Sequence, residues 1–441
     1  MKTLAILKYE WIHFIRSPFK IAAVALFVLA SLYGLHNASS LYHTQVSEIK
    51  QIQSKAEASK AEVIAYYDNH QKGPQGRPWV NVTTPFWAMW YTNLHHFKTP
   101  SPLMVYGIGQ SEQYGYYKKV TFTNSPYDAD MAEEIANPER LQTGSLDFTF
   151  AIIYLLPLLL MICLYNVKGA EIDSGILPII AVQAANTRPW LWIRISFYTV
   201  LAITILALLF VYGGMLTPVF DTHLDDVFSF FLWTLVYLSI WVIGFGILIQ
   251  FGSASTTNTL KMVGVWLLFT FIIPGAVHQW ISMQYPVNLM TDFIDAQRDE
   301  RDQLYALPDS IFQQKLNEKF PQILTSVIMN DSLNRTTAMN ESSYALTNDL
   351  TKNSLEPIEE SYRQKNNAIK HSYWINPVTL FQNKFNSITK THFDDYQGYR
   401  DEIQQLIDHQ IEIMVLDIWN GIEVDEKTYL EYRSKLNANK K

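Results

Sequence analysis

Five long apolar stretches divide the chain into parts that suit a lipid bilayer and parts that suit water. They are Phe19–His36, Phe148–Tyr165, Ile195–Leu216, Val227–Phe251 and Met262–Trp280. Each is close to the roughly 17 to 25 residues with which a helix crosses a hydrocarbon core about 30 Å thick. The second, third and fourth contain no charged residue, and one Asp or Lys at the centre of such a helix costs roughly 2.5 to 3.5 kcal/mol. The sequence therefore predicts an α-helical polytopic membrane protein with five transmembrane helices, the first over residues 19–36 and the other four within residues 147–281.

The positions of lysine and arginine near the ends of these stretches predict their direction. Basic residues gather before the first stretch, between the second and third, and before the fifth: Lys2, Lys8, Arg16, Lys20, Lys168, Arg188, Arg194 and Lys261. The short connection on the opposite side contains Asp221, Asp225 and Asp226 instead. Because short cytoplasmic loops have an excess of Lys and Arg, we expect a cytoplasmic N-terminus and two extracytoplasmic regions, residues 37–146 and 282–441.

Residues 1–18 have the pattern of a cytoplasmic amphipathic helix that lies in the membrane interface. One helical face carries the apolar residues Leu4, Leu7, Trp11, Phe14 and Ile15. The charged residues largely off that face are Lys8, Glu10 and Arg16. Such a helix would turn into the first transmembrane helix near Pro18. Two alternatives stay open, a plain juxtamembrane anchor and a cleavable secretory signal, although a signal has a shorter basic segment and a small-residue cleavage site.

The first extracytoplasmic region has a mixed composition. It begins with a polar, helix-forming run, Thr44–Tyr67, and continues with a proline-rich stretch, Gly73–Tyr127. Such a stretch predicts turns and short strands packed on the membrane surface. An aromatic cluster within it consists of Phe86, Trp87, Trp90 and Tyr91. Interfacial anchoring and core packing both explain this cluster, and a lip that contacts lipid or cargo is the alternative.

The second extracytoplasmic region is predicted to be mainly helical. Its long polar stretches are Asn288–Ala306, Ser343–Lys370 and Asp394–Trp419, with interruptions at Pro308, Pro321 and Pro377. Its most apolar piece, Ile411–Ile422, is shorter than a membrane crossing and contains two acidic residues. We therefore expect no further span in this region.

Charge and motif content exclude several classes of function. The chain has 34 basic and 41 acidic residues, a net charge of −7, and no Lys/Arg run able to follow nucleic-acid phosphates. The one cysteine, Cys163, leaves no pair for a disulfide or a CxxC site. No GxxxxGK[ST] loop, GxSxG elbow or HExxH motif occurs. We therefore expect no cofactor, no metal site and no enzymatic activity in this chain, and adjacent His95 and His96, whose rings point apart, favour surface histidines over a metal site.

The connection between the second and third stretches, residues 166–194, has the most specific pattern. It combines an acidic residue, a Ser-Gly turn, an apolar helical face and a basic end. Its coupling residues, as we call them, are Glu171, Ser174, Gly175, Leu177, Arg188 and Arg194. A short apolar-faced helix in the cytoplasm needs a protein partner to cover it. The alternative is that the helix packs on the chain's own membrane helices.

This pattern resembles that of permease subunits of ABC-2 type transporters, in the branch with large extracytoplasmic inserts. In that family an acidic residue, Ser/Gly and Leu precede small apolar positions and a basic residue, usually Lys, where this chain has Arg194. Further segments that resemble the family are Lys8, Glu10 and Arg16-Ser-Pro; Pro102-Leu103 with Gly107-Ile-Gly109-Gln110-Ser111; Asn137-Pro138 through Asp147-Phe148 to Pro157; and Asn376-Pro377, Phe381-Gln382-Asn383 and Thr389.

The resemblance implies a function as well as a fold. It predicts an export subunit of a bacterial inner membrane, surrounded by lipid and paired with a second permease subunit. A separate ABC ATPase would bind ATP and Mg and would dock on the coupling residues and on the interfacial helix, whose site residues are Lys8, Glu10, Trp11 and Arg16. Uncharged, aromatic-rich spans favour an amphipathic or lipid-like cargo over an ion.

One departure from the family leads to a second hypothesis. The family has six spans and this sequence predicts five, so we expect either a truncated sequence or a missing sixth span. The alternative function is then a non-transporting membrane scaffold that passes ATPase-driven motion to an envelope partner.

Overall fold

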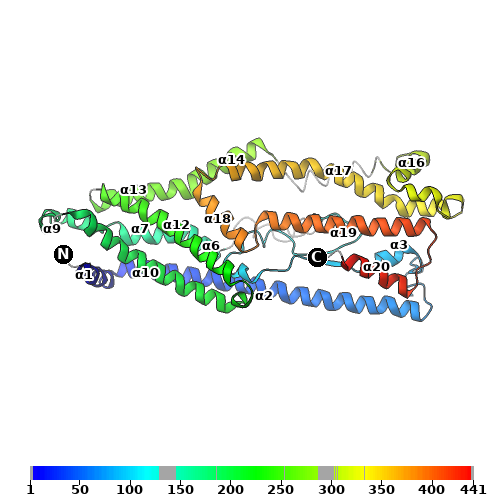
Figure 1. The fold of residues 1–441 in the computed structure, drawn as a ribbon, viewed down its shortest axis with the longest axis horizontal. Helices are drawn as coiled ribbons and strands as arrows, with labels where there is room; N and C mark the ends of the chain where they lie inside the picture. The colour runs from blue at the N-terminus through cyan, green and yellow to red at the C-terminus, as the bar shows by residue number, and fades with distance from the viewer. Residues whose placement is uncertain are drawn as a thin grey trace.

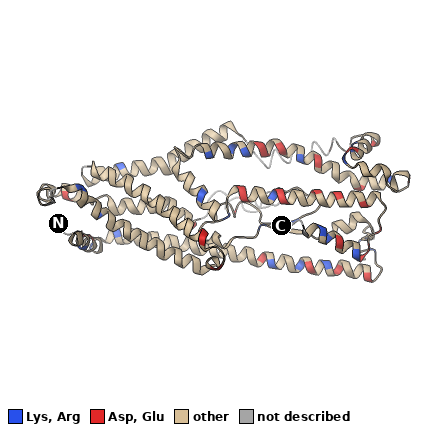
Figure 2. Ribbon diagram, viewed as in Figure 1, with Lys and Arg blue, Asp and Glu red and all other residues tan. Residues whose placement is uncertain are grey.

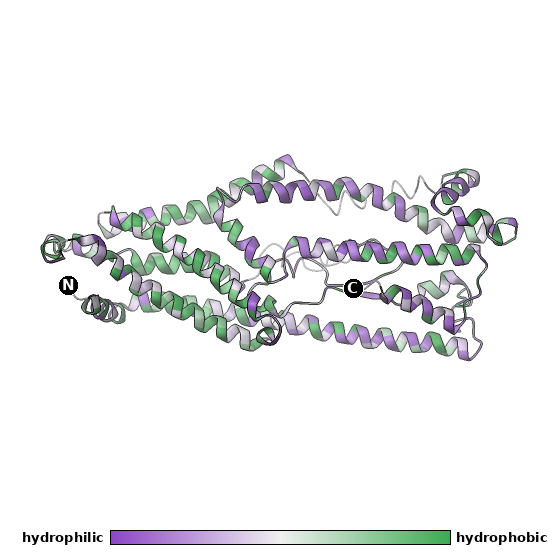
Figure 3. Ribbon diagram, in the orientation of Figure 1, coloured by the Kyte–Doolittle hydropathy of each residue, from purple (hydrophilic) through white to green (hydrophobic). Residues whose placement is uncertain are grey.

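The computed structural model describes residues 3–128, 146–184, 186–252, 254–286, 306–331 and 333–438, together with Asp302 and Leu304. Over these residues the protein is an elongated set of helices, apolar at the end that holds the N-terminus and polar at the other (Figures 1 and 3). We call these ends the apolar half and the polar half. The described residues are 77% helical, which confirms the predicted α-helical class. The expectations for Lys2, Asn137-Pro138 and most of Asn288–Ala306 lie outside the described residues.

Among the described residues, five helical segments are long and apolar enough to cross a membrane, which confirms the number predicted from the sequence. They are Pro18–Asp68 (α2), Phe148–Asp173 (α6, η2, α7 and α8), Thr187–Leu216 (α10), Leu224–Gln250 (α12) and Ser255–Gln284 (α13, η3 and α14). Lys, Arg, Asp and Glu are sparse in the apolar half and frequent in the polar half, which includes the second part of α2 (Figure 2). The second segment is the most buried of the five and the fifth is the least.

The first of these segments, α2, is one continuous helix of 51 residues. The sequence predicts an apolar span, Phe19–His36, and a polar helix, Thr44–Tyr67; the residues between them include no Pro or Gly that would break the helix. At 1.5 Å per residue, a helix of this length extends about 76 Å. Because a bilayer core is only about 30 Å thick, α2 continues from the apolar half to the far end of the polar half (Figure 1).

The polar half combines long helices with a few short elements. Its first part contains α3 (Pro85–Trp90), β1 (His95–Phe97), η1 (Pro102–Val105) and β2 (Tyr117–Lys119), in agreement with the mixed composition expected there. The two strands pair antiparallel, with His96 opposite Lys118. Its second part contains α16 (Asp309–Lys319), η4 (Pro321–Thr325), η5 (Ile328–Asn330), α17 (Arg335–His371), α18 (Pro377–Ile388), α19 (Phe393–Trp419) and α20 (Glu426–Ala438). Proline stands at or just before the start of α16, η4 and α18, as the sequence predicts.

The aromatic cluster of α3 lies in the core of the polar half. The ring of Phe86 is 5.2 Å from that of Phe122 and 5.9 Å from that of Tyr344. Helix α3 packs against α19 and α20, at the end of the molecule farthest from the apolar half (Figure 1). Of the two explanations favoured for this cluster from the sequence, the structure supports core packing, because its rings cover α17 and α19.

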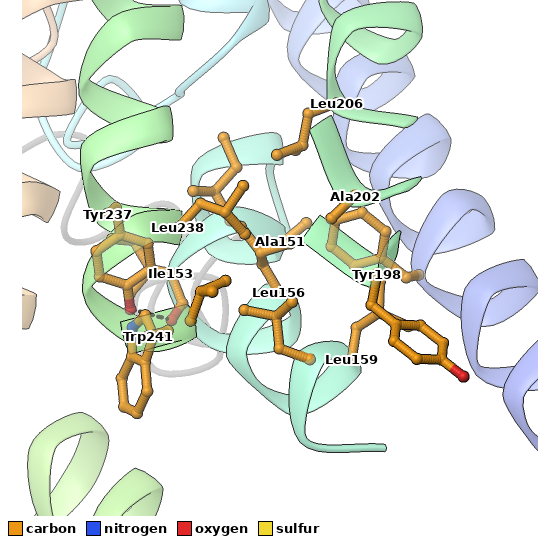
Figure 4. Close-up of a cluster of buried hydrophobic side chains, with 14 of the residues drawn as sticks. Ala151, Ile153, Leu156, Leu159, Tyr198, Ala202, Leu206, Tyr237, Leu238 and Trp241 are labelled. Atoms are coloured by element: carbon orange, nitrogen blue, oxygen red, sulfur yellow. Dashed lines mark hydrogen bonds between the residues drawn. The ribbon is translucent and has the colours of Figure 1, made fainter. Parts of the chain in front are cut away.

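The core of the apolar half is formed mainly by the second, third and fourth spans and by α18, and α1, α2 and η1 add buried residues to it. Figure 4 shows part of it, including Tyr237, whose hydroxyl donates to the Ile153 carbonyl at 2.7 Å. On α18, the Phe385 ring stacks on that of Phe230 at 4.5 Å. One short helix of the polar C-terminal region, α18, thus packs on α12. No local pattern in the sequence indicated this contact.

Two of the described spans contain a π-helical segment just before a proline. These segments are η2 (Ala151–Leu155), followed by Leu156 and Pro157, and η3 (Leu268–Ile272), followed by Ile273 and Pro274. Proline cannot donate a backbone hydrogen bond and its ring clashes with the carbonyl four residues earlier, so a wider turn accommodates it. The two segments also meet, because the ring of Tyr154 in η2 is 5.8 Å from that of Phe271 in η3, and α18 contacts both.

Candidate functional site

Three charged side chains meet in the interior of the apolar half, where helices α1 (Thr3–Ile15), α8 (Gly169–Asp173) and α10 come together. Arg194 on α10 donates from Nε to Oε1 of Glu10 on α1, and from Nη1 to Oε1 of Glu171 on α8. Glu10 is 0% exposed, Arg194 2% and Glu171 8%. We call these three residues the charge cluster. They join two of the segments in which the sequence places site residues, the interfacial helix and the 166–194 connection.

The cluster forms because one face of α1 packs against α10 and another face is exposed. Ile6, Glu10 and Phe14 recur at a spacing of four residues and are buried against α10. The apolar face identified from the sequence is mostly turned outward, with Leu4, Trp11 and Ile15 exposed. Phe14 belongs to that apolar face but is buried. Glu10 lies largely off the face, as predicted, yet it is not at the surface, because the side of α1 with Ile6, Glu10 and Phe14 packs on the protein.

Arg194 is held by aromatic rings as well as by carboxylates. Its guanidinium carbon lies 4.7 Å from the centre of the Trp190 ring and 5.8 Å from that of Tyr9, distances at which a cation is attracted to the ring face. The second carboxylate oxygens of Glu10 and Glu171 have no hydrogen-bond partner among the residues that the structure describes. The charges of Glu10, Glu171 and Arg194 sum to −1, and the buried ammonium of Lys20 nearby offsets this charge. Breaking such a buried pair costs about 3 to 5 kcal/mol.

A second buried polar pair lies beside the charge cluster. Lys20 at the start of α2 donates from Nζ to the hydroxyl of Tyr198 at 2.8 Å, and both residues are buried. Burial lowers the pKa of His13 on α1, and the positive charge of Lys20 lowers it further. From the sequence, Lys20 indicates only the direction of the first span. The four-residue spacing of Arg194 and Tyr198 is the signal that would have shown two polar groups on one face of α10.

The coupling residues form a turn and a short helix after α8. Gly175 has φ +70°, a left-handed conformation that suits glycine, and the Ser174 hydroxyl donates to the Ala170 carbonyl at 2.7 Å. Helix α9 (Leu177–Ala184) follows, with Leu177 and Ile180 packed against the core of the apolar half. The Ser-Gly turn expected from the sequence is therefore present in the backbone.

The outer face of α9 is apolar and exposed. The exposed fractions are 58% for Ile179 and 86% for Val182, and Ile176, just before the helix, continues the face with 47%. This face lies at the end of the molecule that also holds α1 (Figure 1). The sequence left two alternatives for this helix, cover by a protein partner and packing on the chain's own membrane helices. Each applies to one face, since one face packs on the protein's own helices and the other remains open.

The remaining predicted site residues do not join the charge cluster. Arg188, in the first turn of α10, is exposed, and so are Lys8, Trp11 and Arg16. Trp11 contacts α10 through an edge-to-face arrangement with Phe197, with ring centres 6.3 Å apart. The structure thus brings Glu10, Glu171 and Arg194 together and leaves the other charged positions on the surface.

A second convergence, which we call the junction, lies between the two halves. Two of the segments that resemble the ABC-2 family meet there with Thr391, which lies two residues after a third such segment. The Ile108 amide donates to Oδ2 of Asp147 at 2.9 Å, and the Gln110 amide donates to the carbonyl of Thr391 at 3.1 Å. Thr391 also donates from Oγ1 to the Gly107 carbonyl at 3.3 Å. The junction therefore fastens both polar regions to the start of the second span.

The adjacent histidines are used for packing in the polar half. His96 is buried, with Nε2 2.7 Å from Oε2 of Glu402, and its ring stacks on that of Tyr399. His95 is only partly buried and contacts the Asn93 carbonyl through Nδ1 at 3.0 Å. The two rings therefore point apart, as predicted, but the expectation of surface histidines is wrong for His96, which is buried. In the described part of the chain, no three His, Cys, Asp or Glu side chains are grouped so that they could hold a metal ion.

The arrangement is suited to mechanical connection between the two ends of the molecule. The charge cluster fastens α1 and α8 to the third span, and the junction fastens the polar regions to the second. Between them lie the two π segments and α18.

Comparison with known proteins gives no relative: no protein-family model, no curated protein and no solved structure matches the chain.

Proposed function

We propose that this chain is the permease subunit of an ABC-2 type transporter, driven by a separate ABC ATPase that binds ATP and Mg. The observation that supports this best is the charge cluster, because it joins the interfacial helix α1 and the coupling residue Glu171 to one membrane helix, α10. In the family that the sequence resembles, these two elements receive the ATPase. A rigid connection of both to a span would let a partner's motion move the span as a unit.

The exposed face of α9 supports the same proposal. Ile176, Ile179 and Val182 form an apolar surface beside the charge cluster, and such a surface needs a cover in water. We assign that cover to the ATPase. The charge cluster would then lie directly behind the surface that contacts the ATPase. It would transmit motion of the ATPase from α9 through α8 to α10.

The proposal includes a direction and a location. The end with α1, α8 and α9 would face the cytoplasm of a bacterium, the five spans would cross its inner membrane, and the polar half would lie outside. Basic residues near the span ends support this direction. The subunit would work with a second permease subunit, identical or different, and would export an amphipathic or lipid-like cargo, which suits spans without charge at their centres.

A variant of α9 tests the docking step. Ile179→Asp in the full-length tagged chain, purified from native membranes, should abolish copurification of an ATPase that accompanies the unchanged chain in stoichiometric amount. The matched control is Leu333→Asp, an equally drastic change at an exposed leucine of the polar half, which should retain the ATPase. An ATPase that stays bound to Ile179→Asp, or that never accompanies the unchanged chain, would contradict the proposal.

The continuous helix α2 favours a second candidate, the non-transporting scaffold. A single helix of 51 residues connects the apolar half to the far end of the polar half, so motion of the spans would displace that far end. Reconstitution with the ATPase separates the two functions. ATP-dependent movement of a lipid-like cargo supports transport, whereas ATP-dependent change in cross-linking of the polar half without cargo movement supports the scaffold.

A further inference from the structure

A cavity of about 470 Å³ opens beside the charge cluster, between α1, α8, α9 and α10. Its walls are mostly apolar, with Ile6, Ile176, Ile180 and Trp190 among them. Two of the charged residues, Glu171 and Arg194, also line it. The cavity therefore places a carboxylate and a guanidinium in surroundings that are otherwise hydrophobic.

One of the two carboxylate oxygens of Glu171 accepts no hydrogen bond from the described residues. Its Oε1 accepts from Arg194, but its Oε2 is buried and has no hydrogen-bond partner within the described chain. An unpaired buried oxygen of this kind is costly, about 1 to 3 kcal/mol or more for a charged group. A hydrogen bond from an ammonium to a carboxylate oxygen is stronger than one from a neutral donor, so a cationic donor satisfies that oxygen best. The apolar walls suit methylene groups attached to the cation, so the cavity fits an alkylammonium group.

The depth of the cavity indicates where such a group comes from. Arg194 directly precedes the apolar stretch Ile195–Leu216, so the cavity lies at the boundary between the span and water. The exposed apolar residues of α1, Leu4, Trp11 and Ile15, suit the headgroup layer of a membrane. At that depth, ammonium groups on short methylene arms are supplied by phospholipid headgroups.

We propose that this cavity binds the headgroup of an aminophospholipid such as phosphatidylethanolamine. Oε2 of Glu171 is closed to solvent in the structure, so the carboxylate turns toward the cavity when the lipid binds. The ammonium then donates to Oε2, and its ethylene arm packs on Ile176 and Ile180. A lipid bound in this way wedges α1 against α9 and supports the charge cluster from its open side. The site is a property of this chain alone and does not depend on an ATPase.

Native mass spectrometry of the full-length protein in detergent tests the proposal. Phosphatidylethanolamine and phosphatidylglycerol with the same acyl chains are added in equal amounts. The unchanged protein should bind phosphatidylethanolamine about tenfold more tightly, a difference of about 1.4 kcal/mol. Phosphatidylcholine, which has no N–H group, should bind no better than phosphatidylglycerol. Equal binding of all three lipids would overturn the proposal.

Variants assign the preference to the cavity. Glu171→Gln should reduce the preference to less than about twofold, a difference of roughly 0.4 kcal/mol, whereas Asp173→Asn, a change at an exposed carboxylate on the same helix, should retain it. Because Glu171→Gln also weakens the charge cluster, a second variant leaves every charge in place: Ala5→Phe fills the cavity from α1 and should abolish the preference. A preference unchanged in both variants would place the lipid elsewhere and overturn the proposal.

Two further outcomes would identify a different ligand. Displacement of the lipid by excess free ethanolamine would show that a soluble amine suffices, whereas the proposal expects no displacement. If the lipids bind equally and a carbodiimide joins Glu171 to a lysine of a copurified protein, the occupant is a partner's side chain. Either result replaces the lipid with another source of the same ammonium group.

Discussion

The guanidinium Nε of Arg194 donates to the carboxylate of Glu10, although the two residues lie 184 positions apart in the chain. Glu171, 23 positions from Arg194, accepts from Nη1 of the same guanidinium. The planar guanidinium therefore binds two carboxylates through two different nitrogens. A lysine, which has one side-chain nitrogen, could not do this. The N-terminal helix and the 166–194 connection are bound to the third span through this one residue.

Arg194→Lys should destabilise the protein substantially. A single ammonium cannot reach both carboxylates in the geometry of a guanidinium, so one buried carboxylate loses its partner. We expect a loss of about 3 kcal/mol in the free energy of unfolding, in line with other broken buried pairs. Thermal unfolding of the detergent-purified protein, followed by tryptophan fluorescence, measures it.

Arg188→Lys is the matched control for that change. Arg188 lies on the same helix and is exposed, so its replacement should change the free energy of unfolding by less than about 0.5 kcal/mol. If Glu10→Gln and Arg194→Lys are combined, the two effects should be strongly non-additive, because they remove the same contact. Additive effects would mean that Glu10 and Arg194 act independently.

Gly109→Ala should disrupt the junction. Gly109 has φ +54°, and a Cβ at this position would lie 2.8 Å from the carbonyl oxygen of Thr391. The left-handed backbone and the close contact with a main-chain atom together should cost at least about 2 kcal/mol. Loss of thermal stability and faster proteolysis of the polar half are the expected readouts.

Gly398→Ala makes the same chemical change where the structure has room for it. Gly398 lies within α19, and a Cβ there meets no atom of the described chain within 4 Å. Because alanine favours a helix more than glycine does, this variant should gain up to about 1 kcal/mol. A Gly109→Ala protein as stable as Gly398→Ala would show that the junction does not depend on the glycine.

Pro274→Ala should convert the π segment η3 to a regular helix. Alanine restores an amide donor and removes the ring that clashes with the Thr270 carbonyl, a penalty of about 3 kcal/mol in a helix interior. Hydrogen–deuterium exchange of Leu268–Ile272 in detergent should therefore slow. If the chain is a transport subunit, ATP hydrolysis by the copurified ATPase should lose its stimulation by cargo while thermal stability is kept.

The control for this variant is Pro308→Ala, at the start of α16 in the polar half. It should leave exchange in η3 unchanged. Exchange in η3 that is equally fast in Pro274→Ala and in the unchanged protein would rule out the proline as the cause of the π segment.

The elements that depend on local pattern could be predicted from the sequence. The five spans follow from apolar runs of membrane-crossing length, and α17 and α19 contain the predicted stretches Ser343–Lys370 and Asp394–Trp419. The continuity of α2 could also be predicted, because residues 37–43 contain no Pro or Gly that would end a helix. Helix period and breaker residues act over a few neighbours, and a sequence displays them directly.

Contacts between distant segments could not be predicted in the same way. Periodicity shows which residues share a face of α1 but not which element that face contacts, so the partner of Glu10 could not be predicted. The aromatic residues around Phe86 suit a membrane interface and a protein core equally well, and only the packing of Phe122 and Tyr344 against Phe86 decides between them. The return of α18 to α12 depends likewise on ring contacts between residues more than a hundred positions apart.

The carboxyl group of Glu341 on α17 should make the stability of the polar half depend on pH. Burial raises the pKa of Glu341 from 4.5 to about 7. The folded state therefore favours the protonated form. Stability from this group is fully present below pH 4.5, decreases between pH 4.5 and about 7, and is lost above that range.

Glu341→Gln, which has a permanently neutral side chain of the same shape, should remove this dependence. The variant should match the unchanged protein near pH 4.5 and exceed it at pH 8, by about 1 kcal/mol once solvent screening of a partly exposed group is considered. Thermal unfolding of the detergent-purified proteins across this pH range measures the difference. Glu356→Gln, at an exposed position on the same helix, should show no such gain at pH 8. If the two variants have the same pH profile, burial of Glu341 has no part in the stability of the polar half.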